Sequence, residues 1–196
     1  MRIVAGTARG RRLNAPPGRT ARPTSDRTRE ALFSTLTAIH GKLAGARFLD
    51  LYAGSGAVGL EAMSRGAASA VLVESDRSVL RVLRANLAEL GLDGAVVVAS
   101  TVDKFVAEQA DGPYNIVFVD PPYSVGSDRL GAVLGDLRRH GWLADQAIVV
   151  VERASRDSDF TWPDGYVAQR SRRYGEGSLW YGRAAMETAG STGADG

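Results

Sequence analysis

Between residues 46 and 152, short apolar runs alternate with segments of helical periodicity. The runs are ARFLDLY (46–52), SAVLVES (69–75), AVVVAS (95–100), NIVFVD (115–120) and AIVVVE (147–152). The clearest helical segment, residues 78–90, repeats its apolar side chains at helical spacing, with Val79, Leu80, Val82, Leu83, Leu87 and Leu90. Apolar runs that alternate with helices are typical of a parallel sheet covered on both sides. The pattern therefore predicts an α/β, Rossmann-like fold.

The two ends of the chain follow other patterns. Near the C-terminus, YVAQRSRRY (166–174) and SLWYGR (178–183) predict a closing antiparallel pair, which brings the mostly parallel sheet to seven strands. At the front, RIVAG and RRLNA predict a small β-hairpin, and a helix is expected from Thr24 or Ser25 to about Ile39. We expect a basic hairpin and helix over residues 1–42, the sheet domain over 43–184 and a disordered tail over 185–196.

Composition excludes several classes of protein. Of the 196 residues, 44% are apolar and 23% charged, as in an ordinary globular protein. The chain has no cysteine, which excludes disulfides and thiolate metal sites, and His40 and His140 are expected to end helices. No apolar run is long enough to span a bilayer and the N-terminus lacks a signal-peptide core. We expect a cytoplasmic protein with no metal and no membrane partner.

Charge is distributed unevenly along the chain. Residues 1–47 hold ten Lys/Arg against two acids, a balance of +8, whereas the remainder holds fourteen against twenty, a balance of −6. A basic front suggests a polyanionic partner, most simply nucleic acid, although a solvated charged tail would show the same excess. The predicted contacts to a nucleic-acid backbone are Arg9, Arg11, Arg12, Arg22, Arg27 and Arg29. Arg27 could instead form an ion pair with Glu30 on the same helix.

The stretch FLDLYAGSGAVGLEA has the form of a nucleotide-binding loop. Gly54, Gly56 and Gly59 satisfy G-x-G-x-x-G, and Glu74 ends the next apolar run, where a carboxylate can accept both hydroxyls of a ribose. Asp50 precedes the loop, where it would repel a pyrophosphate and attract the ammonium of a methionyl group. A dinucleotide site and a tight turn without ligand are the alternatives.

The stretch VFVDPPY ends the fourth apolar run, so Asp120 should lie at the same sheet edge as the glycine loop. For methyl transfer to an exocyclic amine of a base, Asp120 and the carbonyl of Pro121 can accept the two amine N–H groups. Pro121 and Pro122 fix the direction of that carbonyl, and Tyr123 can stack on the base. A helix-stop turn is the alternative.

DLYAGSG, VLVESD and VDPPY resemble the S-adenosylmethionine motifs of class I amino-methyltransferases. RIVAGTARGRRL and RPTSDRTREALFSTL resemble the N-terminal signature of the bacterial small-subunit rRNA guanine-N2 methyltransferase family often called RsmD, and the resemblance runs from about Met1 to Tyr181. It implies S-adenosylmethionine-dependent methylation of N2 of guanine 966 of 16S rRNA in the assembled 30S subunit. We expect a direct in-line transfer and a monomeric enzyme.

The resemblance also implies a set of site residues. The catalytic residues would be Asp120, Pro121, Pro122 and Tyr123. The cofactor would be bound by Asp50, Tyr52, Gly54, Ser55, Gly56, Gly59, Glu74, Ser75, Thr101, Val102 and Asp120. Many relatives place Asp or Asn where this chain has Thr101, and Asp103 follows two residues later. An adenine-N6 methyltransferase, an NAD-dependent oxidoreductase and a non-catalytic rRNA-binding assembly factor are the rival interpretations.

Overall fold

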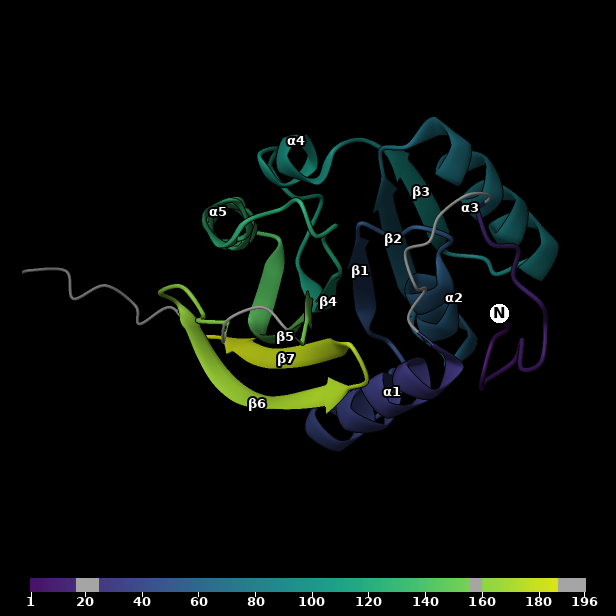
Figure 1. The fold of residues 1–196 in the computed structure, drawn as a ribbon, viewed down its shortest axis with the longest axis horizontal. Helices are drawn as coiled ribbons and strands as arrows, with labels where there is room; N and C mark the ends of the chain where they lie inside the picture. Colours follow the sequence, from purple (N-terminus) through teal and green to yellow (C-terminus); the bar gives the residue numbers. More distant parts are fainter. Residues whose placement is uncertain (17–24, 156–159, 187–196) are drawn as a thin grey trace, which may run out of the picture.

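A computed structural model describes residues 1–16, 25–155 and 160–186. Its centre is one seven-stranded sheet with the order β3-β2-β1-β4-β5-β7-β6 (Figure 1). The strands are β1 Arg47–Leu51, β2 Ser69–Glu74, β3 Ala95–Ala99, β4 Tyr114–Val119, β5 Leu143–Ala154, β6 Tyr166–Tyr174 and β7 Gly177–Ala184. The first five run parallel, and β7 pairs antiparallel with both β5 and β6. The predicted seven-stranded, mostly parallel sheet is confirmed.

Helices cover both faces of the sheet (Figure 1). They are α1 Asp26–His40, α2 Ala57–Ser64, α3 Arg77–Leu90, α4 Val102–Val106 and α5 Ser127–Arg139. Side chains alternate between the faces along each strand: Phe48 of β1 joins the core that contains α1, α2 and α3, while the next residue, Leu49, joins the core of α4 and α5. Two hydrophobic cores therefore sandwich one sheet, as the Rossmann-like prediction requires.

The N-terminal hairpin is less regular than predicted. In place of two strands there is one β-bridge, Arg2↔Arg12. Several backbone N–H groups of this segment donate to α2 instead: Val4 and Ala5 donate to the Glu61 carboxylate, at 2.7 and 2.9 Å, and Ala8 donates to the Ser64 hydroxyl. Because these donors bind α2, they are not available to a strand ladder. The segment is docked on the sheet domain through α2.

The first helix begins and ends almost where the sequence predicted. Ser25 caps α1, its hydroxyl accepting the N–H of Thr28 at 3.1 Å, and the helix ends at His40. Phe33 of α1 lies 6.3 Å from Phe48 of β1 between ring centroids, so α1 shares a core with the sheet. His140 follows the last residue of α5, so both histidines end helices as expected. The expectations for Arg22 and residues 187–196 lie outside the described residues.

Candidate cofactor and substrate site

The carboxyl ends of β1 and β4 lie side by side at the point where the strand order reverses. The chain leaves β1 through α2 toward β2, whereas it leaves β4 through α5 toward β5. Leu51 pairs with Val119, and the N–H of Asp120 donates to the carbonyl of Leu51 at 3.4 Å. Doubly wound sheets bind their ligands at such a switch point. The glycine loop after β1 and the Asp120 loop after β4 therefore share one edge of the sheet.

Asp50 lies beneath the start of α2. Its Oδ2 accepts the N–H of Gly59 at 2.8 Å, and the residue is only 1% exposed. Since the N-cap residue of α2, Gly56, has no side chain to cap the helix, Asp50 supplies an acceptor to the first turn. Burial raises the pKa of Asp50 to about 7, the Gly59 N–H opposes that rise, and the Glu74 charge adds to it. Its contact with a methionyl ammonium stays a prediction.

Glu74 joins the loops that follow β1 and β2. Its Oε2 accepts the N–H of Gly54 at 3.0 Å, and its Oε1 accepts the N–H groups of Ser75 and Asp76, both at 2.8 Å. Each carboxylate oxygen can accept more than one hydrogen bond, so ribose hydroxyls could still be bound here. The backbone bonds hold the carboxylate at the sheet edge, where the sequence placed it.

The three motif glycines are needed for different reasons. A Cβ on Gly56, whose φ is 82°, would lie 2.3 Å from Leu83 Cδ1, and one on Gly59 would lie 2.8 Å from Leu72 Cδ2. These two glycines allow α2 to pack closely on its neighbours. A Cβ on Gly54 would meet only the carbonyl oxygen of Tyr52, at 4.0 Å. The space beside Gly54 is therefore open to a ligand.

Tyr52 occupies a strained and polar position at the end of β1. Its φ of 63° is left-handed, which is uncommon for a residue other than glycine. Its hydroxyl is buried and has no hydrogen-bond partner among the described residues. Burial raises the pKa of Tyr52 to about 12, and the Asp103 carboxylate adds to the rise. A buried hydroxyl without a partner is a candidate for contact with a bound polar group.

The residues expected to contact an adenine have other contacts in the structure. The Thr101 hydroxyl caps α4, accepting the Lys104 N–H at 3.4 Å, and the Val102 side chain is buried in the core. Asp103 accepts two hydrogen bonds from Arg129, at 2.7 and 2.5 Å, and this hydrogen-bonded guanidinium lowers the Asp103 pKa. Val102 could reach a ligand through its backbone, and its side chain is core packing.

Ser55 and Ser75 differ in their surroundings. Ser55 is buried, its hydroxyl lies 3.9 Å from the sulfur of Met1, and its carbonyl accepts Asn86 Nδ2 at 2.9 Å. Ser75 is exposed beside Glu74. Asn86, which the sequence did not single out, is fully buried and also exchanges two hydrogen bonds with the backbone of Asn14.

The Asp120 loop presents an aromatic ring at the shared edge. Pro121 is buried, while Pro122 and Tyr123 are exposed, and the Tyr123 side chain ranks among the large exposed apolar groups at 67%. The Pro122 carbonyl accepts the N–H of Val125 at 2.9 Å, closing a turn. Arg153 of β5 donates to the carbonyl of Val125 at 2.9 Å and ties the loop to the sheet. A rigid turn and an exposed ring at this edge suit the binding of a flat base.

One of the predicted RNA contacts is wrong. Arg29 is fully buried, and its guanidinium donates to the Asp26 carboxylate and the carbonyl of Arg2, each at 2.6 Å. The reason is helical spacing: position 29 falls on the same face of α1 as the core residues Leu32 and Phe33. The other predicted arginines that the structure describes are exposed: Arg9, Arg11, Arg12 and Arg27.

Two further features concern membranes and metals. None of the helices in residues 1–16, 25–155 and 160–186 combines the length and apolar character needed to cross a membrane. In the same ranges no three His, Asp or Glu side chains gather closely enough to hold a metal ion.

Comparisons with known proteins agree on the kind of protein. The family model described as Conserved hypothetical protein 95 matches residues 1–183. Ribosomal RNA small subunit methyltransferase D of Escherichia coli K12 is 41% identical over 195 residues, 100% of this chain and 94% of that protein. The protein of the same name from Haemophilus influenzae is 32% identical, covering 89% of each chain. The solved structure of yhhF from Escherichia coli superposes with a TM-score of 0.83 at 38% identity, covering 95% of this chain and 99% of that one.

Proposed function

Because the chain belongs to the Conserved hypothetical protein 95 family, alongside small-subunit rRNA methyltransferases, we propose that it methylates N2 of guanine 966 in 16S rRNA. The methyl donor is S-adenosylmethionine, and the substrate is the assembled 30S subunit. The enzyme acts as a monomer in the cytoplasm. One observation carries the proposal: the strand register sets Asp120 beside the glycine loop, at the edge that also holds Glu74. An rRNA methyltransferase needs its donor and its base at one edge in this way.

The residues at this edge fit the proposed donor. Gly54 leaves open space beside its backbone, and the Tyr52 hydroxyl has no partner in the described part of the chain. Glu74 presents a carboxylate that suits ribose hydroxyls, and Asp50 lies behind the loop, where a bound cation would favour its ionised form. When bound, S-adenosylmethionine supplies a methyl group already activated on a sulfonium. Residues of this chain need therefore only hold and orient the acceptor.

The Asp120 loop would orient the guanine amine. The lone pair of an exocyclic amine is delocalised into the ring, so its nitrogen is a weak nucleophile. Asp120 and the carbonyl of Pro121 would accept its N–H groups, which turns the lone pair out of conjugation and stabilises the developing positive charge. Tyr123, exposed at the same edge, would stack on the base after it is rotated out of the helix.

Labelled-methyl transfer to undermethylated 30S subunits, followed by mapping of the modified base, tests the function. We expect Asp120→Ala to lower the transfer rate by at least about 10²-fold, with 30S binding largely intact. Asp93→Ala, which removes an exposed carboxylate distant from the edge, is the matched control. Unchanged transfer by Asp120→Ala refutes its role, and a label mapped to adenine N6 refutes the guanine assignment. Calorimetry with S-adenosylmethionine and NAD in parallel tests the donor, and tight NAD binding would overturn it.

A further inference from the structure

The edge strand of the sheet carries an arginine cluster that the sequence analysis did not select. Arg170, Arg172 and Arg173 lie on β6, and all three are exposed. None of their guanidiniums forms an ion pair with a carboxylate in the described parts of the chain. Three positive charges on one strand attract a polyanion.

These arginines lie near the end of the sheet where the carboxyl ends of β1 and β4 form the candidate site. β7 runs antiparallel to β5, so the β6–β7 turn comes back to the carboxyl end of β5, where the N–H of Ser155 donates to the carbonyl of Glu176 at 2.7 Å. Val119, the last residue of β4, pairs with Val151 of β5. Asp120 and Glu152, the next residues along the two chains, therefore lie at the same level of the sheet.

The strand register places Arg172 on the same row. Glu152 pairs with Leu179 on β7, and Leu179 pairs with Arg172 on β6. Arg172 is therefore three strands from Asp120 on one cross-strand row, roughly 14 Å at the usual strand spacing. This distance is short enough for a phosphate of an RNA strand whose target base lies at Asp120 to reach Arg172.

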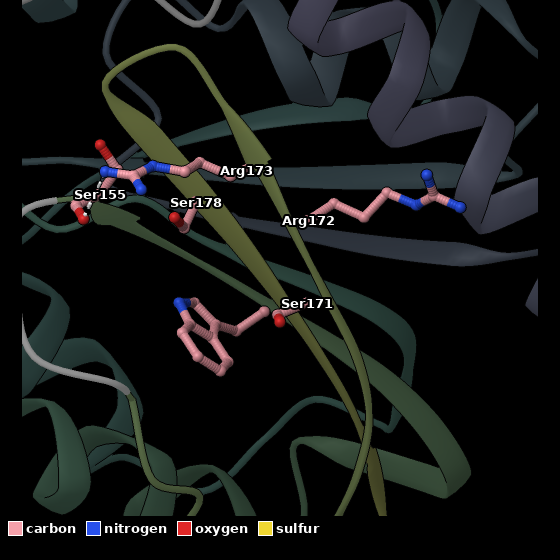
Figure 2. Close-up of a pocket in the computed structure, with 6 residues that line it drawn as sticks. Ser155, Ser171, Arg172, Arg173 and Ser178 are labelled. Atoms are coloured by element: carbon pink, nitrogen blue, oxygen red, sulfur yellow. Dashed lines mark hydrogen bonds between the residues drawn. The ribbon is translucent and has the colours of Figure 1, made fainter.

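A hollow with hydrogen-bond donors lies beside the cluster (Figure 2). Its volume is about 200 Å³, and it is lined by Ser155, Ser171, Arg172, Arg173, Ser178 and Trp180. Figure 2 shows Arg173 leaning over Ser155 and Ser178, while Arg172 extends in the opposite direction. Arg173 Nη2 donates to the carbonyl of Ser155 at 3.1 Å, which holds the guanidinium over the hollow. Guanidinium forks with neighbouring hydroxyls suit phosphate oxygens.

We propose that the β6 arginine surface binds backbone phosphates of the rRNA strand next to the target base. It consists of Arg173, Ser155 and Ser178 on one face of the edge strand and of Arg170 and Arg172 on the other face. The identity of the RNA rests on the proposed function, whereas the preference for phosphate rests on the charge and donors described here. The surface would be a second basic contact for RNA, in addition to the N-terminal segment. That segment is bound to α2 and α3, whereas β6 lies beyond β4 and β5 in the strand order.

The test compares two double variants in binding to undermethylated 30S subunits at several salt concentrations. Arg172→Gln with Arg173→Gln removes two charges from the surface. Lys42→Gln with Arg139→Gln is the control. It removes two exposed charges near the amino ends of the parallel strands, since Lys42 precedes β1 and Arg139 ends α5.

We expect the first double variant to bind about tenfold more weakly, and its slope of log K against log salt to fall by about 1.5 to 2. Its affinity for S-adenosylmethionine and its kcat at saturating subunits should match the parent, and the control double variant should keep the parent slope.

Every other outcome overturns either the proposed phosphate site or the proposed function. Equal losses in both double variants mean a general effect of net charge and overturn the proposal, as does parent-like binding by the first. Weaker binding with an unchanged salt slope indicates a ribosomal protein as the contact and overturns the assignment to phosphate. If the parent binds subunits with a slope that depends on Arg172 and Arg173 yet transfers no methyl group, the proposed function fails and the phosphate site stands.

Discussion

Replacing Asp50 by asparagine separates the charge of this buried side chain from its shape. The carboxamide has nearly the same size and can keep an oxygen acceptor for the N–H of Gly59. It cannot ionise. Any part of the pH dependence of stability that comes from Asp50 is therefore lost in the variant, while the first turn of α2 keeps its hydrogen bond.

The magnitude follows from the shift of the Asp50 pKa. Burial raises that pKa from 3.8 to about 7, and at about 1.36 kcal/mol per pH unit the difference corresponds to about 4 kcal/mol. The unfolded chain releases the Asp50 proton near its ordinary pKa, whereas the folded protein keeps the proton until about pH 7. The contribution of Asp50 to stability is therefore most favourable below about pH 4, falls as the pH rises to about 7, and is constant above that.

The variant should be less stable than the parent in acid and more stable in base. Its buried amide N–H₂ group costs about 1–3 kcal/mol if it finds no acceptor, at every pH. Above about pH 7 the relief of about 4 kcal/mol from removing the buried charge exceeds this cost, so a net gain of about 1–3 kcal/mol is expected near pH 8. Near pH 4.5 the same substitution should give a net loss.

Urea unfolding of the ligand-free protein, followed by tryptophan fluorescence from about pH 4.5 to 8, measures this difference. Asp93→Asn, at an exposed position, is the control and should show no such reversal of sign. A difference between the Asp50 variant and the parent that stays constant over the whole range would refute the reasoning, because it would mean that Asp50 does not titrate between its unfolded value and about pH 7.

Three further substitutions test the glycine loop and the docking of the N-terminal segment. Gly56→Ala should lower the free energy of unfolding by about 2–3 kcal/mol, since its Cβ would overlap Leu83 and its φ is left-handed; a loss below about 1 kcal/mol in urea unfolding would contradict this. Gly54→Ala should cost only about 1 kcal/mol yet weaken S-adenosylmethionine binding at least about tenfold in calorimetry; parent-like affinity would show that no ligand approaches Gly54. Glu61→Leu should destabilise by about 3–5 kcal/mol, because it leaves two backbone N–H groups and Arg65 without their carboxylate, and limited proteolysis should then cut within residues 1–16 first.

The central strands were predictable because they are buried on both faces. An apolar run without alternation has few interpretations once it is short and followed by a helix, and four of the five core strands end within one residue of the prediction. The exception is β5, which starts at Leu143 although its apolar run starts at Ala147. The register between β4 and β5 shifts between Tyr114 and Ile116, so Leu143 pairs with Tyr114 before the apolar run begins. No local sequence pattern predicts this shift.

The candidate site was predictable for a topological reason. Parallel strands bring their carboxyl ends to one edge, so Asp50, Glu74 and Asp120 could be placed together from their positions at the ends of runs. Charge alone places Arg29 on the surface, whereas its helical spacing relative to Leu32 places it on the buried face of α1. A charge balance over long segments hides the β6 arginines, because acids elsewhere in the domain outnumber them. The stretch YVAQRSRRY carries three arginines and no acid, which a shorter window would have found.

Contacts that hold the site together could not be predicted, because they join segments far apart in the sequence. Asn86, buried on α3, donates to the carbonyl of Ser55 in the glycine loop and to the carbonyl of Asn14 in the N-terminal segment. Glu61 on α2 fixes the same segment from a second side. A buried amide or carboxylate with all its partners in place is rigid, because moving any one partner leaves a polar group unsatisfied. The basic N-terminal segment and the loop proposed to bind the methyl donor are therefore held in one frame, and displacement of the segment by RNA would be transmitted to Ser55 through the Asn86 side chain.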